Sequence, residues 1–196
     1  MSVREQRLRA EYENIKKMRS RVFTWVLIGD SKIPDKYEFT FKLKSVIGIN
    51  SGKAVTHGLY KVLVEFGGDY PRVKPEVRLV SSQRPWPIHP NIFRDGRFCL
   101  EGDQNWIPGV GVPLDSIILM VGEILAYQEV NVRSPANADP VLLEWIKKNL
   151  IYETGSNTKI KNPIDSSPIR LPDIDDLVKW GGDEQDPPPN RIVFGG

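Results

Sequence analysis

Residues 114–128, LDSIILMVGEILAYQ, can form regular structure only if other layers bury them on nearly every side. Aliphatic residues recur there at helical spacing and leave little of the helix surface for solvent. Pro113 precedes them, and proline is favoured at the first turn of a helix. The stretch therefore predicts a central buried helix whose apolar contacts come from Leu114, Ile117, Ile118, Val121, Ile124 and Leu125.

The remaining patterns predict the layers that cover this helix. Apolar residues at helical spacing predict an amphipathic first helix over residues 4–19, and a last helix is expected after Asp139, with Pro140 in its first turn. Four stretches rich in β-branched and aromatic residues predict an antiparallel meander. These stretches are residues 21–28, 37–47, 59–66 and 76–80. The expected fold class is α+β, with helices on one side of a four-stranded antiparallel sheet.

Two further segments differ from these elements in composition. Residues 80–113 lack periodicity but contain many aromatic and apolar side chains, which predicts a long ordered loop that includes the functional residues. From residue 151 the chain is rich in Pro, Gly, Ser, Asn and Asp. We therefore predict a domain over residues 1–150 and a C-terminal extension over residues 151–196, partly ordered at most and not part of the core.

Composition argues against several classes of function. The chain has one cysteine and two histidines, which excludes an internal disulfide and argues against a structural zinc site. Its net charge of +2 is too small to indicate a nucleic-acid partner. No apolar run reaches membrane-spanning length, and the first residues are charged rather than apolar. These features predict a soluble intracellular protein, cytoplasmic or, in a eukaryote, also nuclear.

The cysteine, Cys99, lies eight residues after Asn91 in the run HPNIFRDGRFCL. A thiol is a strong nucleophile, and a carboxamide beside it can donate hydrogen bonds to the oxyanion that forms when the thiol attacks a carbonyl. This spacing suggests acyl-transfer chemistry. However, many lone cysteines are small buried side chains, and Asn91 can also cap a turn. The pair alone leaves both interpretations open.

The motifs around this pair follow one another in a specific order. YPRVKPEV is followed by HPNI, by G-x-x-CL at Cys99, by a Trp-x-Pro turn and by SPANADP before the last helix. Over residues 4–150 this order resembles the ubiquitin-conjugating enzymes. The resemblance implies that Cys99 accepts ubiquitin or a ubiquitin-like protein as a thioester, by transthiolation from an activating enzyme, and transfers it to a lysine amine. It implies no cofactor for this chain.

The resemblance also implies roles for residues around the thiol. Asn91 would stabilise the oxyanion or the loop that surrounds it, and these two roles are not separable from the sequence. His89 and Pro90 would be structural parts of the motif, so His89 is not expected to act as a base. Ser134 would lie near the nucleophile and orient the attacking lysine, whose pKa would be lowered by desolvation.

Partner surfaces are implied in the same way. The activating enzyme would dock on the basic face of the first helix, formed by Arg4, Arg7, Lys16 and Lys17, and a ligase would contact Arg72, Val73, Ile107 and Pro108. A protein substrate completes the set of partners, with no nucleic acid and no membrane. Arg72 replaces a common Phe, which puts binding of RING-type ligases in doubt, and Phe93 replaces a Tyr found in some relatives. These departures indicate a divergent member, from a prokaryotic or specialised pathway.

Three alternatives remain at this stage. The chain could be a catalytically silent interaction module of the same fold, although such modules are recognised by loss of the cysteine. A Cys99–His89 hydrolase pair lacks a recognisable third orienting group. The terminal Gly195-Gly196 would suit the activated tail of a ubiquitin-like modifier, but glycine is common in tails.

Overall fold

The computed structural model describes residues 1–82, 84–100, 111–154, 157–167 and 169. Within these residues the elements are, in chain order, α1 (Val3–Lys17), β1 (Phe23–Leu27), β2 (Lys36–Phe41), β3 (Ser45–Asn50), β4 (Lys53–His57), β5 (Tyr60–Glu65), β6 (Glu76–Leu79), α2 (Leu114–Leu125), α3 (Pro140–Asn149), β7 (Ile151–Thr154) and β8 (Asn157–Ile160). In the part of the chain that is described, no helix has the length and apolar character needed to cross a membrane.

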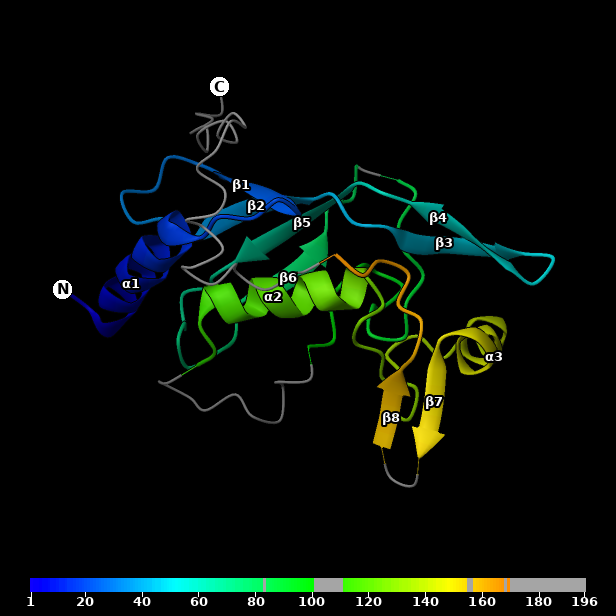
Figure 1. The fold of residues 1–196 in the computed structure, drawn as a ribbon. Coiled ribbons are helices and arrows are strands. Elements are labelled where there is room, and N and C mark those ends of the chain that lie inside the picture. Colours follow the sequence, from blue (N-terminus) through cyan, green and yellow to red (C-terminus); the bar gives the residue numbers. More distant parts are fainter. Residues whose placement is uncertain (83, 101–110, 155–156, 168, 170–196) are drawn as a thin grey trace, which may run out of the picture.

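The main sheet is antiparallel and has the strand order β1-β2-β5-β6. Buried and partly exposed residues alternate along β2 and β5, because successive side chains of a strand point to opposite faces. Phe39 faces Val62 across these two strands, and both are fully buried. Helix α2 runs along this buried face, with α1 near one end of the sheet (Figure 1). The α+β prediction is confirmed.

The predicted strand over residues 37–47 is wrong in one respect, because it is two strands. β2 ends at Phe41, and β3 begins at Ser45 and pairs with β4 in a separate hairpin that extends beyond the main sheet (Figure 1). The hairpin packs on α3, where the Trp145 ring N–H donates to the Gly52 carbonyl at 3.1 Å. A second, smaller core forms between them from Val46, Tyr127, Val130, Leu142, Ile146 and Leu150.

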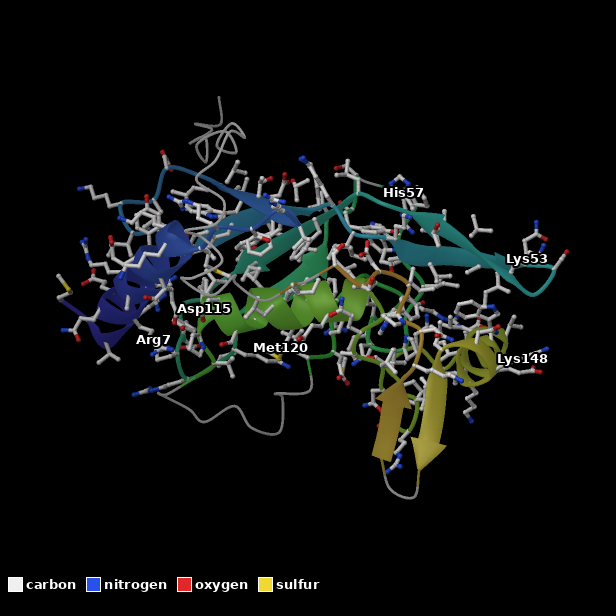
Figure 2. All side chains as sticks on the ribbon, viewed as in Figure 1. Arg7, Lys53, His57, Asp115, Met120 and Lys148 are labelled. Carbon is white, nitrogen blue, oxygen red and sulfur yellow. The ribbon has the colours of Figure 1, made fainter. Side chains whose placement is uncertain are left out.

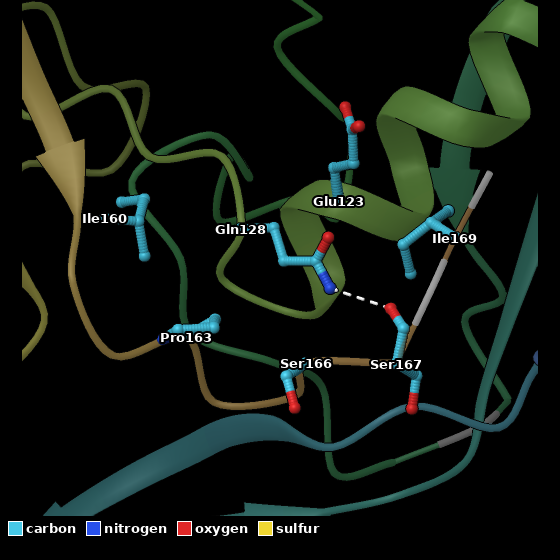
Figure 3. A pocket seen from close by; sticks show the side chains of 7 residues that line it. All are labelled: Glu123, Gln128, Ile160, Pro163, Ser166, Ser167 and Ile169. Carbon is cyan, nitrogen blue, oxygen red and sulfur yellow. Dashed lines mark hydrogen bonds between the residues drawn. The ribbon is translucent and has the colours of Figure 1, made fainter.

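The prediction that no residue beyond 150 belongs to the core is also wrong. Ile169 is 2% exposed and packs on α2, where a methyl group added to Gly122 would lie 2.5 Å from its side chain. The segment before it is held to the domain by the Gln128 side chain, which donates to the Asp165 carbonyl at 2.9 Å. It also donates to the Ser167 carbonyl at 2.9 Å (Figure 3). The Asp165 carboxylate accepts from the Lys44 backbone N–H at 2.8 Å.

A cavity of about 460 Å³ lies between this C-terminal segment and the end of α2, lined by Glu123, Gln128, Ile160, Pro163, Ser166, Ser167 and Ile169 (Figure 3). The domain boundary after residue 150 stays a prediction, but residues 160–167 and 169 are attached to the domain by these contacts. Residues 170–196, including Gly195-Gly196, lie outside the described residues.

Candidate active site

Cys99 and Asn91 lie opposite each other in a short hairpin. The Cys99 N–H donates to the Asn91 carbonyl at 2.7 Å, and the Phe93 N–H donates to the Arg97 carbonyl at 2.9 Å. Ile92 and Phe98 form an antiparallel bridge between these two bonds. Gly96 in the turn has φ +87°, which glycine adopts without strain. A hairpin of this length places Cys99 across from Asn91, which explains the spacing of eight residues between them.

The hairpin extends the main sheet beyond β6. The Phe98 N–H donates to the Val77 carbonyl at 3.0 Å, and the Leu79 N–H donates to the Gly96 carbonyl at 2.9 Å. Ile92 and Phe98 point into the core, where they are 2% and 7% exposed. Because side chains alternate along a strand, Asn91, Phe93, Arg97 and Cys99 share the opposite face. Cys99 is half-buried there.

Asn91 joins the hairpin of residues 91–99 to the loop before α3. It is 1% exposed, and its side-chain oxygen accepts the Asn131 N–H at 2.8 Å. Within the described residues, its side-chain nitrogen has no hydrogen-bond partner. The Asn131 side chain in turn accepts the Ser134 N–H at 2.9 Å, and the Asn137 N–H donates to the Pro90 carbonyl at 3.1 Å. These bonds bring Ser134, which is exposed, to the same edge of the molecule as Asn91.

His89 is fully buried beneath this hairpin. Its Nδ1 accepts the Asn91 N–H at 2.9 Å, and its ring meets the Tyr127 ring edge-on at 4.3 Å between centroids. Burial lowers the pKa of His89 to about 3, an effect only partly offset by the backbone of Glu129. The imidazole is therefore neutral at pH 7 and a weak base, and its Nδ1 is occupied by the loop.

The predicted partner residues lie elsewhere. The Arg4 side chain donates to Asp35 and to the Phe66 carbonyl, both at 3.0 Å, and Arg7 pairs with Glu11 at 2.6 Å, so both arginines have internal partners. Lys16 pairs with Glu13 on the surface of α1, and Lys17 is exposed. Arg72 and Val73 are also exposed, on the turn before β6. Ile107 and Pro108 lie outside the described residues.

The sequence prediction missed three residues of this framework: Glu11, Tyr127 and Asn131. Glu11 is 1% exposed, and its carboxylate accepts from Arg7, from the Tyr70 hydroxyl at 2.8 Å and from the Leu114 N–H at 2.8 Å. Arg7 and Asp115, labelled in Figure 2, mark the parts of α1 and α2 that Glu11 joins. A signal existed for Glu11, since its position falls on the apolar stripe between Leu8 and Ile15.

The comparisons with known proteins agree with this fold. A family model described as ubiquitin-conjugating enzyme matches residues 7–155, which is more than half of the chain. The chain belongs to the ubiquitin-conjugating enzyme family.

Two relatives show how far the likeness extends. The chain is 31% identical over 113 residues to "Ubiquitin-conjugating enzyme E2 2" of Candida albicans, covering 57% of each chain. It is 33% identical over 87 residues to the Candida glabrata protein of the same name, covering 44% of this chain and 47% of that one. The matched part therefore spans about half the length of these relatives.

Among solved structures, S. cerevisiae Ubc12 is similar with a TM-score of 0.52 and 22% identity, over 73% of this chain and 71% of that one. At this identity the likeness supports the fold alone.

Proposed function

We propose that this chain is a conjugating enzyme that carries ubiquitin or a ubiquitin-like protein as a thioester on Cys99. The observation that carries the proposal is the hairpin register, which sets the half-buried thiol residue directly across from Asn91. The carboxamide oxygen of Asn91 is occupied by Asn131, whereas its nitrogen has no partner among the described residues. This arrangement offers two N–H donors beside a nucleophile.

The reaction consists of two acyl transfers. In the first, the Cys99 thiolate attacks the thioester that an activating enzyme holds, so that a new C–S bond forms on Cys99 and the partner's thiolate leaves. In the second, a lysine amine of the target attacks the Cys99 thioester, a C–N bond forms, and the Cys99 thiolate leaves. The lysine nitrogen loses a proton to solvent. Each attack passes through a tetrahedral oxyanion, which the Asn91 amide would stabilise.

Proton transfer in this scheme does not involve His89. Its neutral ring is buried, and its Nδ1 is bonded to the Asn91 backbone. Ser134 can orient the incoming lysine by a hydrogen bond, but a hydroxyl takes no proton at neutral pH. Transfer of the lysine from water into the site lowers its pKa and provides the neutral amine that the attack requires.

The partners of this reaction would be the modifier, an activating enzyme, a protein substrate and a ligase. For the activating enzyme, α1 remains the proposed docking surface. Since Arg4 and Arg7 have internal partners, Lys16 and Lys17 at the end of the helix would supply the charge that an acidic partner recognises. No cofactor enters the scheme.

A charging assay tests the proposal. We expect an adduct on Cys99 when the chain is incubated with ATP and with a modifier and activating enzyme already shown to react with each other, and we expect a reducing agent to remove it. Cys99→Ser should give an oxyester that resists the reducing agent. Absence of any adduct across the known modifier pairs would rule out the enzyme and favour a silent module.

A further inference from the structure

The C-terminal segment that packs on α2 contains a serine in a sequence that a class of kinases recognises. Ser167 is followed by Pro168 and, at the third position after it, by Arg170. Protein kinases read the pattern of residues around the acceptor, and Ser-Pro-x-Arg is the pattern of the proline-directed class. The chain has one other Ser-Pro pair, at Ser134, but there the third position is Asn137. Pro168 and Arg170 lie outside the described residues, so the pattern is a property of the sequence.

Ser167 belongs to a strap, residues 163–167 and 169, that polar contacts hold to the domain. The Ser167 N–H donates to the Asp165 carboxylate at 2.9 Å, and the Ser167 carbonyl accepts from the Gln128 side chain at 2.9 Å. The Ser167 side chain is partly exposed and is directed away from the Gln128 amide (Figure 3). Both bonds are made by the backbone, so a group added to the hydroxyl oxygen replaces neither of them directly.

The surroundings of Ser167 are unfavourable to added negative charge. The Asp165 carboxylate fastens the strap by accepting the Lys44 backbone N–H at 2.8 Å, and Glu123 of α2 lines the same cavity as Ser167. The Lys44 side chain is exposed, where water and salt screen its charge. A phosphate adds a charge of about −1.5 to −2 near neutral pH, and beside carboxylates it disrupts by repulsion. A phosphate on Ser167 therefore weakens the attachment of the strap.

The kinase pattern also includes a residue that is part of the core. Ile169 lies between Pro168 and Arg170 in sequence and is 2% exposed, packed beside Gly122 of α2. A kinase binds its substrate as an extended segment, so Ile169 has to leave this position before Ser167 can react. Phosphate added to the open strap then opposes its return, which shifts the population toward the open state.

We propose that Ser167 is the phosphorylation site of a proline-directed kinase, and that its phosphate holds the strap away from α2. The Ser167 hydroxyl oxygen attacks the γ-phosphorus of ATP bound to the kinase, a P–O bond forms on the serine, and the bond to ADP breaks. The hydroxyl proton goes to the catalytic base of the kinase. Opening of the strap uncovers the end of α2 around Gly122. The site is separate from the proposed chemistry at Cys99 and does not depend on it.

Phosphorylation of the full chain tests the site. With a recombinant cyclin-dependent kinase and ATP, we expect one phosphate, assigned to Ser167 by tandem mass spectrometry. Ser167→Ala should abolish it, and Ser166→Ala, the matched control one residue earlier, should retain it. A phosphate on Ser134 in place of Ser167, or no phosphate on Ser167 in both the unmodified chain and Gly122→Ala, would overturn the site.

A variant of α2 tests whether the strap has to open. Gly122→Ala places a methyl group 2.5 Å from the Ile169 side chain and leaves the kinase pattern unchanged, so the rate of Ser167 phosphorylation should rise about tenfold. Ser116→Ala, at the other end of α2, is the control and should leave the rate unchanged. If Gly122→Ala fails to fold, Gln128→Ala removes two bonds to the strap and serves the same purpose. Equal rates in the unmodified and opened chains would overturn the requirement for opening.

Hydrogen–deuterium exchange tests the effect of the phosphate. Amides of residues 160–167 and 169 should exchange several-fold faster in the phosphorylated chain than in the unmodified one, because their hydrogen bonds open more often. Amides of β2 and β5 should exchange at unchanged rates in both forms. Unchanged or slower exchange of the strap after phosphorylation of Ser167 would overturn its release.

Discussion

Glu11 and Asn91 are both 1% exposed, yet their hydrogen bonding differs. Glu11 has both carboxylate oxygens occupied, one by Arg7 and Tyr70 and the other by the Leu114 N–H. Asn91 has its side-chain oxygen occupied, but its nitrogen has no partner among the described residues.

The difference shows two uses of a buried polar side chain. Pro113 provides no side-chain cap for α2, so Glu11 supplies from α1 the acceptor and the negative charge that a helix N-terminus favours. Because both of its carboxylate oxygens accept hydrogen bonds, Glu11 contributes to the stability of the fold. A buried group with unused donors costs stability, and in the proposed function Asn91 would use those donors in a transition state.

The largest effect is expected from changes at Asn91. Asn91→Ala should slow discharge of the Cys99 thioester to lysine by about 10²–10³-fold and should slow charging less, as measured by single-turnover kinetics. Asn91→Asp keeps an acceptor for the Asn131 N–H but has no donor, so it should discharge slowly as well. Wild-type discharge by Asn91→Asp would show that the carboxamide acts only through the loop.

Glu11→Ala should have the next largest effect, and on stability rather than chemistry. It leaves the buried Leu114 N–H and Tyr70 hydroxyl without an acceptor, so the free energy of unfolding in urea should fall by about 3 kcal/mol. The discharge rate of the folded protein should change little. Glu13→Gln, which alters an exposed pair on the same helix, is the control and should change stability by less than about 0.5 kcal/mol. A loss of discharge in Glu11→Ala that matches Asn91→Ala would contradict the comparison.

A smaller effect is expected from pH, through His89. Its folded pKa of about 3 lies below the unfolded value of about 6.5, so the unfolded chain binds the proton first as pH falls. The folded state keeps its full stability with respect to His89 above pH 6.5, where the imidazole is neutral in both states, and loses stability as pH falls toward 3. The free energy of unfolding should therefore drop by about 2 kcal/mol between pH 7 and pH 5. His89→Gln should remove this dependence and His57→Gln should keep it; an unchanged slope in His89→Gln would mean that another group is responsible.

The smallest effect is expected at Ser134. Its backbone N–H holds the bond to Asn131, so Ser134→Ala should leave the loop in place and remove only the hydroxyl. Discharge to lysine should slow by roughly fivefold or less, with no change in charging. A fall in the discharge rate as large as that of Asn91→Ala would contradict this expectation and would mean that the hydroxyl takes part in the chemical step.

The elements with strong periodicity were predictable from the sequence. The helices α1, α2 and α3 follow from apolar spacing, and the four strands of the main sheet follow from their β-branched and aromatic residues. Asp139 caps α3 through the Leu142 N–H, as its position before Pro140 predicts. The break between β2 and β3 was not predicted, because residues 37–47 read as one β-rich run and the bend at residues 42–44 depends on tertiary contacts.

The candidate site was predictable in its motif residues but not in its supports. Cys99, Asn91 and His89 stand out by their spacing, whereas Asn131 has no local pattern and acts through a bond formed forty residues away in sequence. Ile169 was missed because its neighbours have the composition of a linker, although one isoleucine is enough to fill the space beside Gly122. Long-range packing of single residues is not encoded in composition or period.

In the hairpin of residues 91–99, the pairing of Cys99 with Asn91 depends more on the length of the turn than on which residues form it. Deleting one residue from positions 94–96 would shift the second strand by one place relative to Asn91, and side chains on a shifted strand exchange faces. Phe98 would then face outward and Cys99 would face the core, away from any incoming acyl group. A change of turn sequence is therefore tolerable wherever Gly96 keeps its conformation, whereas a change of turn length is expected to be inactivating even though every motif residue is retained.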